Sequence, residues 1–245
     1  LDLVDFDTAL ADLDGYNANN DYCKLWWFPY TDKIQVYTFN KTTQSRGGAG
    51  LSGFLDQTGI SGVVFAGLLQ VTRTIPGSIP YILNTLQNFH YRPQRRVDRS
   101  DKVIKVSSSI PVHQETEYAI PIEQGARAIE DLRKMVLKAN YRVNFPLEVR
   151  FLEADDIPLS PASGRDSCFL GPNVSSRKLA PQYFAEFEEL MLDYGGRPHW
   201  GKSFNRTAEQ LQKLYPALGR FDELRRQNDP HDLFRNSFVD RVFAG

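Results

Sequence analysis

The sequence predicts an α+β domain in which helices cover an antiparallel or mixed sheet. Two β-branched and aromatic runs, residues 24–30 and 33–39, are separated only by Thr31 and Asp32, which is typical of paired antiparallel strands. Beyond residue 114, strand-like runs alternate with amphipathic helical runs, which indicates helices packed on a sheet. Because the first strand pair is a hairpin, we do not expect a purely parallel sheet.

The composition is that of a globular protein long enough to bury a large core. The 245 residues are 41% hydrophobic and 24% charged, which excludes a disordered chain and a coiled-coil rod. With 29 Lys and Arg against 30 Asp and Glu, the net charge is −1, so no basic field is expected to hold nucleic acid. Two cysteines without a C-x-x-C pair predict neither a disulfide scaffold nor a metal site.

The N-terminal residue is Leu1, and no charged leader followed by an apolar core precedes the first structured stretch. We therefore predict no signal peptide, and we expect the chain to begin inside a longer product. The compartment stays open between the cytoplasm and a membrane surface.

The first 20 residues are expected to form a short amphipathic helix. Phe6, Leu10 and Leu13 recur at helical spacing before Gly15 and an Asn-rich turn. The strand pair of residues 24–39 follows this helix.

The segment from about 45 to 105 differs in composition and is expected to be a variable helical segment. Apart from Arg73, residues 57–91 carry no formal charge if His90 is neutral. A membrane span needs about 20 apolar residues, and Arg73 and two prolines interrupt this run, so short buried helices are our main interpretation. A surface that faces a membrane or a partner protein is the alternative.

Two further patterns in this segment are interpreted as loops. The arginine-rich residues 92–99 lack interleaved aromatic side chains for base stacking, so we expect a solvated loop. Residues 48–53 match G-x-G-x-x-G, but no Asp or Glu that could bind a ribose occurs between Asp56 and Asp98. We expect a glycine linker there and no dinucleotide site.

From residue 114 onward the predicted elements are regular. We expect strands over 114–121, 147–152 and 166–170, and helices over 123–138, 182–194 and from Thr207 onward. The first helix has one apolar face and acids in its first turn, and the second stops at two glycines. Thr207-x-x-Gln210 is a capping box, and the last helix is expected to end near Asp229 and Pro230.

The strand that begins at Leu147 carries the first candidate for chemistry. With a period of two, Leu147, Val149 and Phe151 point to one face, and Glu148 and Arg150 point to the other. An acid and a base two residues apart can lock each other and present donors and an acceptor to a ligand. The alternative is a solvent-facing pair that contributes well under ~1 kcal/mol.

A second candidate is the loop of residues 195–202. Two glycines end a helix, Pro198 stiffens the chain, and His199, Trp200 and Lys202 follow. A proton-accepting ring, a flat aromatic and a cation in one place suit a planar cofactor or a polyol. The alternative is a turn with a buried Trp.

The turn of residues 160–167 places Arg165 beside Asp166, for which we expect a structural ion pair. The sequence contains no Gly-x-Ser-x-Gly elbow and no H-E-x-x-H motif, so it does not support hydrolase or metal chemistry.

These motifs occur in a familiar order. Glu-Val-Arg at 148–150 is followed by Leu-Ser-Pro-x-x-x-Arg-Asp-Ser at 159–167 and by Phe-Glu-x-x-Met-x-x-x-Gly-Gly-Arg-Pro-His-Trp-Gly-Lys at 187–202. Together they resemble the C-terminal half of the sugar-1,4-lactone oxidases, a family that includes L-gulonolactone oxidase, D-arabinono-1,4-lactone oxidase and the related alditol oxidases. The resemblance covers nearly the whole chain except the segment at about 45–105.

The resemblance implies a flavoprotein of the vanillyl-alcohol-oxidase type. In that family an N-terminal domain binds FAD, often covalently through a histidine, and a C-terminal cap domain covers the flavin ring and shapes the substrate pocket. Residues 1–245 resemble the cap domain alone, so the FAD-binding domain is expected to be absent from this chain. The isolated chain is then expected to be inactive.

The resemblance also assigns roles to individual residues. Glu148 and Arg150 fall on the active-site acid and arginine, and Lys202 falls on a lysine that reaches substrate and flavin. His199 and Trp200 belong to the same loop and are expected to contact the substrate (His199) and the cofactor (both). Asn173 stands where alditol oxidases have a substrate-binding threonine.

The implied reaction is hydride transfer from a lactone CH–OH group to flavin, with an ascorbate-type product. Arg150 and Lys202 are expected to stabilise developing negative charge, and Glu148 to orient Arg150 or accept a substrate hydroxyl. The expected partners are a sugar lactone and the FAD-binding domain. An alditol oxidase cap and a non-catalytic module that binds a membrane or partner through residues 57–91 are the alternatives.

Overall fold

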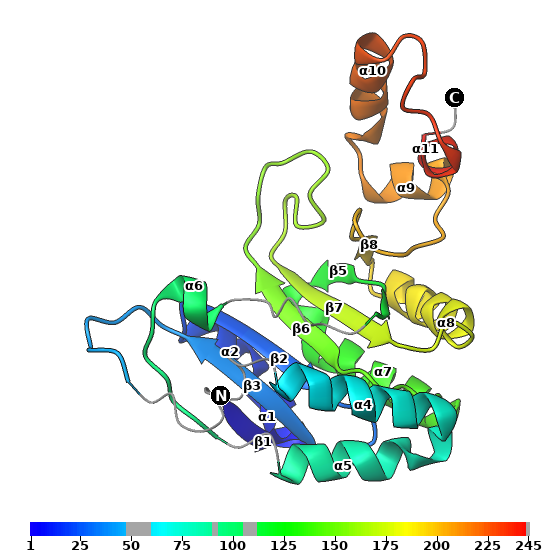
Figure 1. Cartoon of the computed structure of the whole chain (residues 1–245). Helices are drawn as coiled ribbons and strands as arrows, with labels where there is room; N and C mark the ends of the chain where they lie inside the picture. Colours follow the sequence, from blue (N-terminus) through cyan, green and yellow to red (C-terminus); the bar gives the residue numbers. More distant parts are fainter. Residues whose placement is uncertain (48–59, 90–92, 105–111, 244–245) are drawn as a thin grey trace.

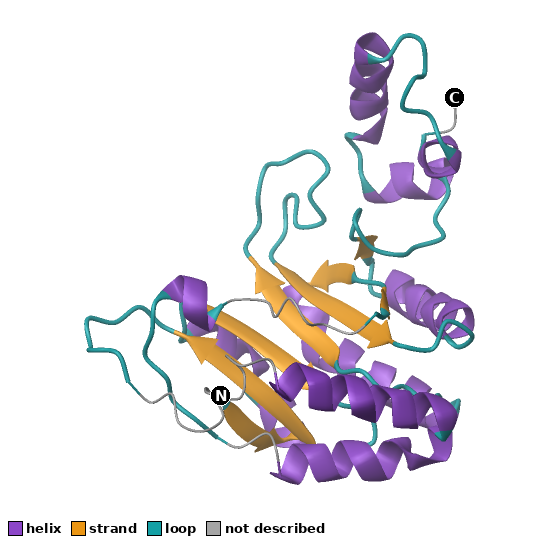
Figure 2. Cartoon of the chain, in the orientation of Figure 1, coloured by secondary structure: helices purple, strands orange, loops and turns teal. Residues whose placement is uncertain are grey.

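The structure, a computed structural model, describes residues 1–47, 60–89, 93–104 and 112–243, without the side chains of residues 60–62 and 89. The glycine pattern at 48–53 and parts of the predicted segment at 45–105 lie outside these residues. Within them, the predicted α+β class is confirmed (Figure 2).

An antiparallel sheet of eight strands organises the described chain, in the order β1-β3-β2-β6-β7-β5-β8, with β4 beside β7. The strands are β1 (Asp2–Asp5), β2 (Tyr22–Trp27), β3 (Lys33–Phe39), β4 (Gln114–Glu115), β5 (Tyr118–Pro121), β6 (Leu147–Leu152), β7 (Ser167–Val174) and β8 (Arg197–Pro198). The predicted hairpin is β2 and β3, and the strands expected from residues 147 and 166 are confirmed as β6 and β7. The single strand expected over 114–121 is instead divided into β4 and β5.

Helices α7 (Gly125–Lys138) and α8 (Ala180–Asp193) pack on one face of this sheet (Figure 1). Their apolar sides meet alternate strand residues such as Leu25, Val149 and Leu170, all of which are buried. The prediction that Leu147, Val149 and Phe151 share the core face of β6 is therefore confirmed. Burial of this apolar surface is the main source of stability for the fold.

The N-terminal prediction is wrong in part, because the first residues form an edge strand. In β1, Leu3 and Val4 pair with Gln35 and Ile34 of β3, and only then do α1 (Phe6–Ala11) and α2 (Leu13–Ala18) begin. Four strand residues are too few for their spacing to distinguish a strand from a helix turn.

The predicted helices of residues 57–91 are found as α4 (Ile60–Thr74) and α5 (Ile79–Phe89), joined by the 3₁₀ turn η1 (Pro76–Ser78). Only one side of this pair is buried, where Ile79 and Leu83 pack against Phe28. The expectation of buried helices is thus wrong for the other side, where Val63 is 73% exposed and Tyr81 is 77% exposed. Arginine-rich residues 93–99 are mostly loop and precede the short α6 (Ser100–Val103).

The C-terminal residues form three helices that stand away from the sheet (Figure 1). They are α9 (Ala208–Leu214), α10 (Leu218–Asn228) and α11 (Ser237–Val242). Gln210 accepts a hydrogen bond of 3.0 Å from the Thr207 backbone N–H, as the capping box predicts. The last helix does not end near Asp229, however, because Asn236 caps the additional helix α11.

Candidate active site

The sheet face turned away from α7 and α8 carries the candidate site and is called the site face below. Strand pairing places its side chains in rows. One row contains Trp26, Glu148, Gly171 and Glu117, and the next contains Lys24, Arg150, Phe169 and Ala119. Glu148 and Arg150 therefore project from the same face of β6, as predicted.

Arg150 reaches a carboxylate that the sequence analysis did not identify. Its guanidinium donates a hydrogen bond to Glu117, whose side chain is 5% exposed, whereas the Arg150 side chain is 47% exposed. Gly171 lies beside Glu117, since a Cβ at Gly171 would be in van der Waals contact with the Glu117 Cγ, at 3.6 Å. Burial lowers the pKa of Arg150, but the Glu117 and Glu148 carboxylates hold it above its ordinary value.

Glu148 forms its ion pair with β2 and not with Arg150. The Lys24 Nζ lies 3.8 Å from the Glu148 Oε1 and 4.6 Å from the centre of the Trp26 ring. Burial lowers the pKa of Lys24, Glu148 raises it, and the neighbouring Arg150 lowers it further. The expected locking of Glu148 by Arg150 is thus replaced by two separate ion pairs that lie side by side.

Lys202 joins the same face through Glu115. Its ammonium forms an ion pair with the Glu115 carboxylate, and His113 Nε2 lies 2.5 Å from the other Glu115 oxygen. Burial lowers the pKa of Lys202 below its ordinary value, because it disfavours the charged form of the amine. Glu115 is paired with Asn173 of β7, so the predicted substrate-binding Asn173 is adjacent to this ion pair.

The loop that carries Lys202 is held by backbone bonds to residues 115–117. The His199 N–H donates to the Glu117 carbonyl at 2.9 Å, and the Ser203 N–H donates to the Glu115 carbonyl at 3.0 Å. The His199 ring accepts a hydrogen bond of 3.1 Å from the Gly201 N–H. His199 is therefore held next to Glu117, the partner of Arg150.

Trp200 is held on the core side of the loop. Its indole N–H donates to the Leu159 carbonyl at 2.8 Å, and its ring lies 4.9 Å from the Tyr215 ring. These contacts explain why a tryptophan stabilises the loop, and its predicted contact with a cofactor stays a prediction.

The turn of residues 160–167 supports the loop in a different way from that expected. The salt bridges among the described residues do not include an Arg165–Asp166 pair. Arg165 donates instead to the backbone carbonyls of Ala119 and Gly195, at 3.0 and 2.9 Å. Asp166 accepts from the Ala154 N–H. The role is structural, as predicted, but the partners are backbone groups.

Sequence reasoning missed Lys24, Glu115 and Glu117. The signal for the two acids was present, because Glu115 and Glu117 are two residues apart in a predicted strand and so share one face. Their partners could not be found in this way, since each depends on strand order and register.

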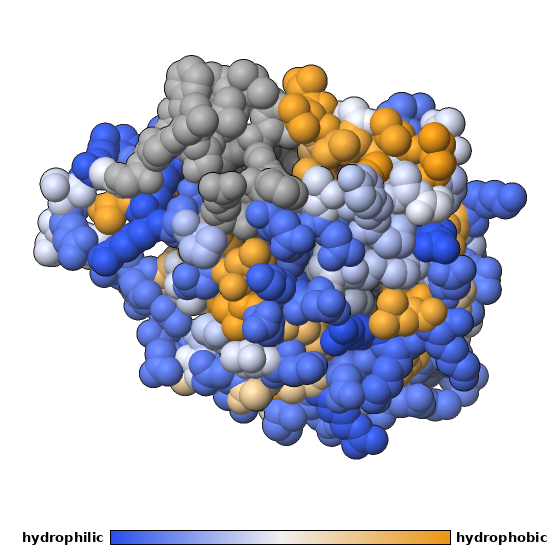
Figure 3. Space-filling model, turned by 90° about the horizontal axis from the view of Figure 1, so that it is seen from below, coloured by the Kyte–Doolittle hydropathy of each residue, from blue (hydrophilic) through white to orange (hydrophobic). Residues whose placement is uncertain are grey.

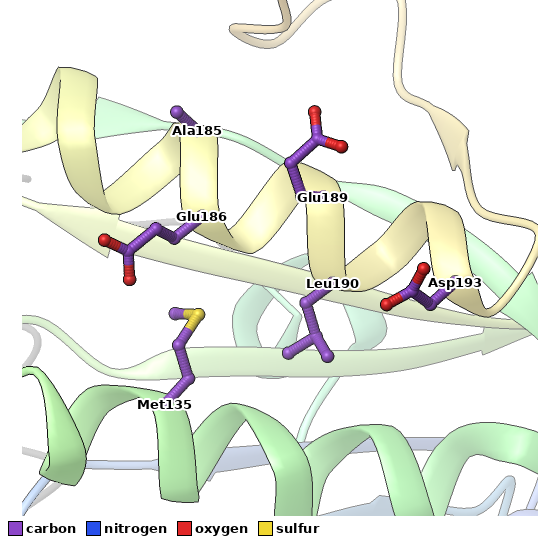
Figure 4. A pocket seen from close by; sticks show the side chains of 6 residues that line it. All are labelled: Met135, Ala185, Glu186, Glu189, Leu190 and Asp193. Atoms are coloured by element: carbon purple, nitrogen blue, oxygen red, sulfur yellow. The ribbon is translucent and has the colours of Figure 1, made fainter.

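A hollow with a volume of about 450 Å³ lies elsewhere, between α7 and α8 (Figure 4). Its lining residues are Met135, Ala185, Glu186, Glu189, Leu190 and Asp193. None of the candidate site residues lines it, and it is open to solvent. The charged side chains that meet on the sheet face are instead the candidate site. Within the described residues, no group of three or more His, Cys, Asp or Glu side chains could hold a metal ion.

Comparison with known proteins gives one consistent result. The family described as D-arabinono-1,4-lactone oxidase matches residues 2–242. The chain is 32% identical over 241 residues to L-gulonolactone oxidase of Scyliorhinus torazame, and 33% identical over 237 residues to L-gulono-1,4-lactone dehydrogenase of Mycobacterium tuberculosis. These matches cover 96% of this chain and 54% and 55% of the relatives, so the chain spans about half their length.

A shorter match reaches the alditol oxidase of a Streptomyces species, at 34% identity over 99 residues, which is 40% of this chain and 24% of that protein. The family match extends over nearly the whole chain and includes every residue of the site face. The chain therefore belongs to the D-arabinono-1,4-lactone oxidase family.

Proposed function

We propose that this chain is the substrate-binding cap domain of an FAD-dependent aldono-1,4-lactone oxidase or dehydrogenase, whose FAD-binding domain lies outside these 245 residues. Family membership supports an oxidoreductase that acts on a lactone. The observation that carries the assignment is the set of ion pairs formed by Lys24, Arg150 and Lys202 on the site face.

The residues of this face fit the ring of a flavin. Arg150 and Lys202 lie on this face as hydrogen-bond donors, with the side chains of Trp26 and Phe169 beside them. When bound, a flavin supplies the hydride acceptor. Lys202 would contact the ring, and His199 and Trp200 would hold the loop that presents Lys202.

The chain's own residues would position and polarise the lactone. The Arg150 guanidinium can donate hydrogen bonds to two substrate oxygens and stabilise the negative charge that develops on the hydroxyl oxygen as its proton is lost and the hydride leaves the carbinol carbon. The Glu148 carboxylate can accept a hydrogen bond from a substrate hydroxyl. Because each cation is already paired with a carboxylate, the face has little net charge, which suits a neutral lactone.

Substrate profiling of the protein with its FAD-binding domain tests this proposal. We expect aldono-1,4-lactones to reduce the flavin faster than open-chain polyols, and Lys202→Ala to slow the reduction about 10²-fold by removing one charge-stabilising donor. The exposed Lys213→Ala is the control and should match the parent. Faster reduction by polyols would favour an alditol oxidase, and equal rates for parent and Lys202→Ala would remove Lys202 from the site.

A second candidate function is a surface that binds a membrane or a partner protein. The exposed side of α4 carries Val63, Val64 and Val71, and apolar side chains gather along the edge of the molecule on which α4 lies (Figure 3). No described helix is both long and apolar enough to cross a membrane. The contact that we propose is made by the exposed side of α4.

Co-sedimentation with anionic liposomes tests this second candidate. We expect Val64→Asp and Leu68→Asp to reduce binding at least ~10-fold, because a charge opposes burial of the apolar face in lipid. Thr85→Asp on the exposed side of α5 adds the same charge outside the apolar face and is the control. A parent protein that stays in the supernatant would contradict this function.

A further inference from the structure

The Glu115-Thr116-Glu117 segment contacts both the loop that carries Lys202 and the Arg150 side chain of β6. Their carbonyls accept hydrogen bonds from His199 and Ser203, on either side of Lys202. Their carboxylates contact Arg150 and Lys202 themselves. The segment from the end of β4 to the start of β5 thus holds the loop, and it also holds Lys202 of the loop and Arg150 of β6.

Register explains how one segment reaches both cations. Glu115 is opposite Asn173, and Tyr118 is opposite Leu170, so Glu117 falls opposite Gly171. Arg150 is opposite Phe169, in the next row of β7. The Arg150 guanidinium therefore extends diagonally across β7 to reach Glu117.

The burial of Glu117 indicates a constrained ion pair. Glu117 as a whole is 4% exposed, and a buried carboxylate is stable only if its charge is compensated. The more exposed partner, Arg150, has to stay near Glu117 for that reason. The N–H groups of Arg150 that do not bind Glu117 then point over the site face, where they can donate to a ligand.

We propose that Glu117 and Glu115 are positioning residues, which orient Arg150 and Lys202 respectively for the reaction of the site. This inference rests on the proposed function. Glu117 is buried beneath Arg150 and acts through it, and Glu115 acts through Lys202. Each carboxylate should matter only while its own cation is present.

A reciprocal double-mutant cycle tests this coupling in the protein with its FAD-binding domain, with anaerobic flavin reduction by lactone as the measurement. We expect Glu117→Gln to lower the limiting reduction rate about 10-fold and to change the rate less than about 2-fold in an Arg150→Ala background. The same is expected for Glu115→Gln and Lys202→Ala. The crossed pairs, such as Glu117→Gln with Lys202→Ala, serve as controls and should be close to additive.

Losses that are equal in every background would mean that the two carboxylates only support the fold, and would overturn the proposal. A measurement without substrate separates this result from failure of the proposed function. In NMR spectra, the Nη–H signals of Arg150, identified by their loss in Arg150→Lys, should be distinct from those of exposed arginines in the parent, because Nη2 donates to Glu117. They should shift toward those of exposed arginines in Glu117→Gln. An unchanged signal would also overturn the positioning role. If no lactone reduces the flavin of the parent protein, the proposed function is contradicted, whereas the positioning role is still decided by the measurement without substrate.

Discussion

Replacing Arg150 by Ala in the protein with its FAD-binding domain is expected to lower kcat/KM for lactone about 10²- to 10³-fold, or about 2.7–4 kcal/mol of transition-state stabilisation. The guanidinium is the most exposed of the three paired cations of the site face, so it is the donor most accessible to a ligand. Steady-state kinetics with several aldono-1,4-lactones measure the effect.

Two further variants separate charge from geometry at this position. Arg150→Lys keeps a positive charge but loses the planar pair of donors, so its kcat/KM should fall between those of the parent and Arg150→Ala. Arg220→Ala removes an exposed arginine of α10 and should change kcat/KM less than about 2-fold. If Arg150→Ala retains more than about a third of the parent kcat/KM with every lactone, the assignment of Arg150 to the site is wrong.

The fold class was predictable because local sequence carries its signals. Alternation in residues 147–152 reports which side chains face the core, and Gly195, with a φ of +65°, ends α8 where the sequence places the stop. Edge strand β1 and helix α11 were missed because their four and six residues show no clear period.

The candidate site was predictable only in its positions. The sequence places Glu148 and Arg150 on one face, but their partners come from β2 and from the junction of β4 and β5. Those contacts depend on the register between strands that lie far apart in the sequence; Arg150 and Glu117, for example, are 33 residues apart. Local spacing carries no information on that register, so the expected pairing of Glu148 with Arg150 was wrong.

The buried charge network around Glu188 should show the largest effect on stability. The Glu188 carboxylate accepts hydrogen bonds from the Tyr118 hydroxyl, from the Asn205 N–H at 3.0 Å and from the Arg206 Nε at 2.9 Å. The residue is 2% exposed. Glu188→Ala would leave Arg206 and Tyr118 without their buried partner, so we expect a loss of about 3–5 kcal/mol in the free energy of unfolding. Urea unfolding measures this loss.

The adjacent Glu189 provides the matched control, because it also contacts Arg206 but its side chain is 70% exposed. Glu189→Ala should cost less than about 1 kcal/mol. Tyr118 follows Glu117 directly, and Asn205 follows the loop that carries Lys202. Glu188→Ala should therefore also make Glu117 and this loop more mobile at temperatures where the chain is still folded. Equal free energies of unfolding for Glu188→Ala and Glu189→Ala would contradict this expectation, and would mean that water replaces the lost carboxylate. The backbone hydrogen bonds of His199 and Ser203 would then hold the loop without the Glu188 network.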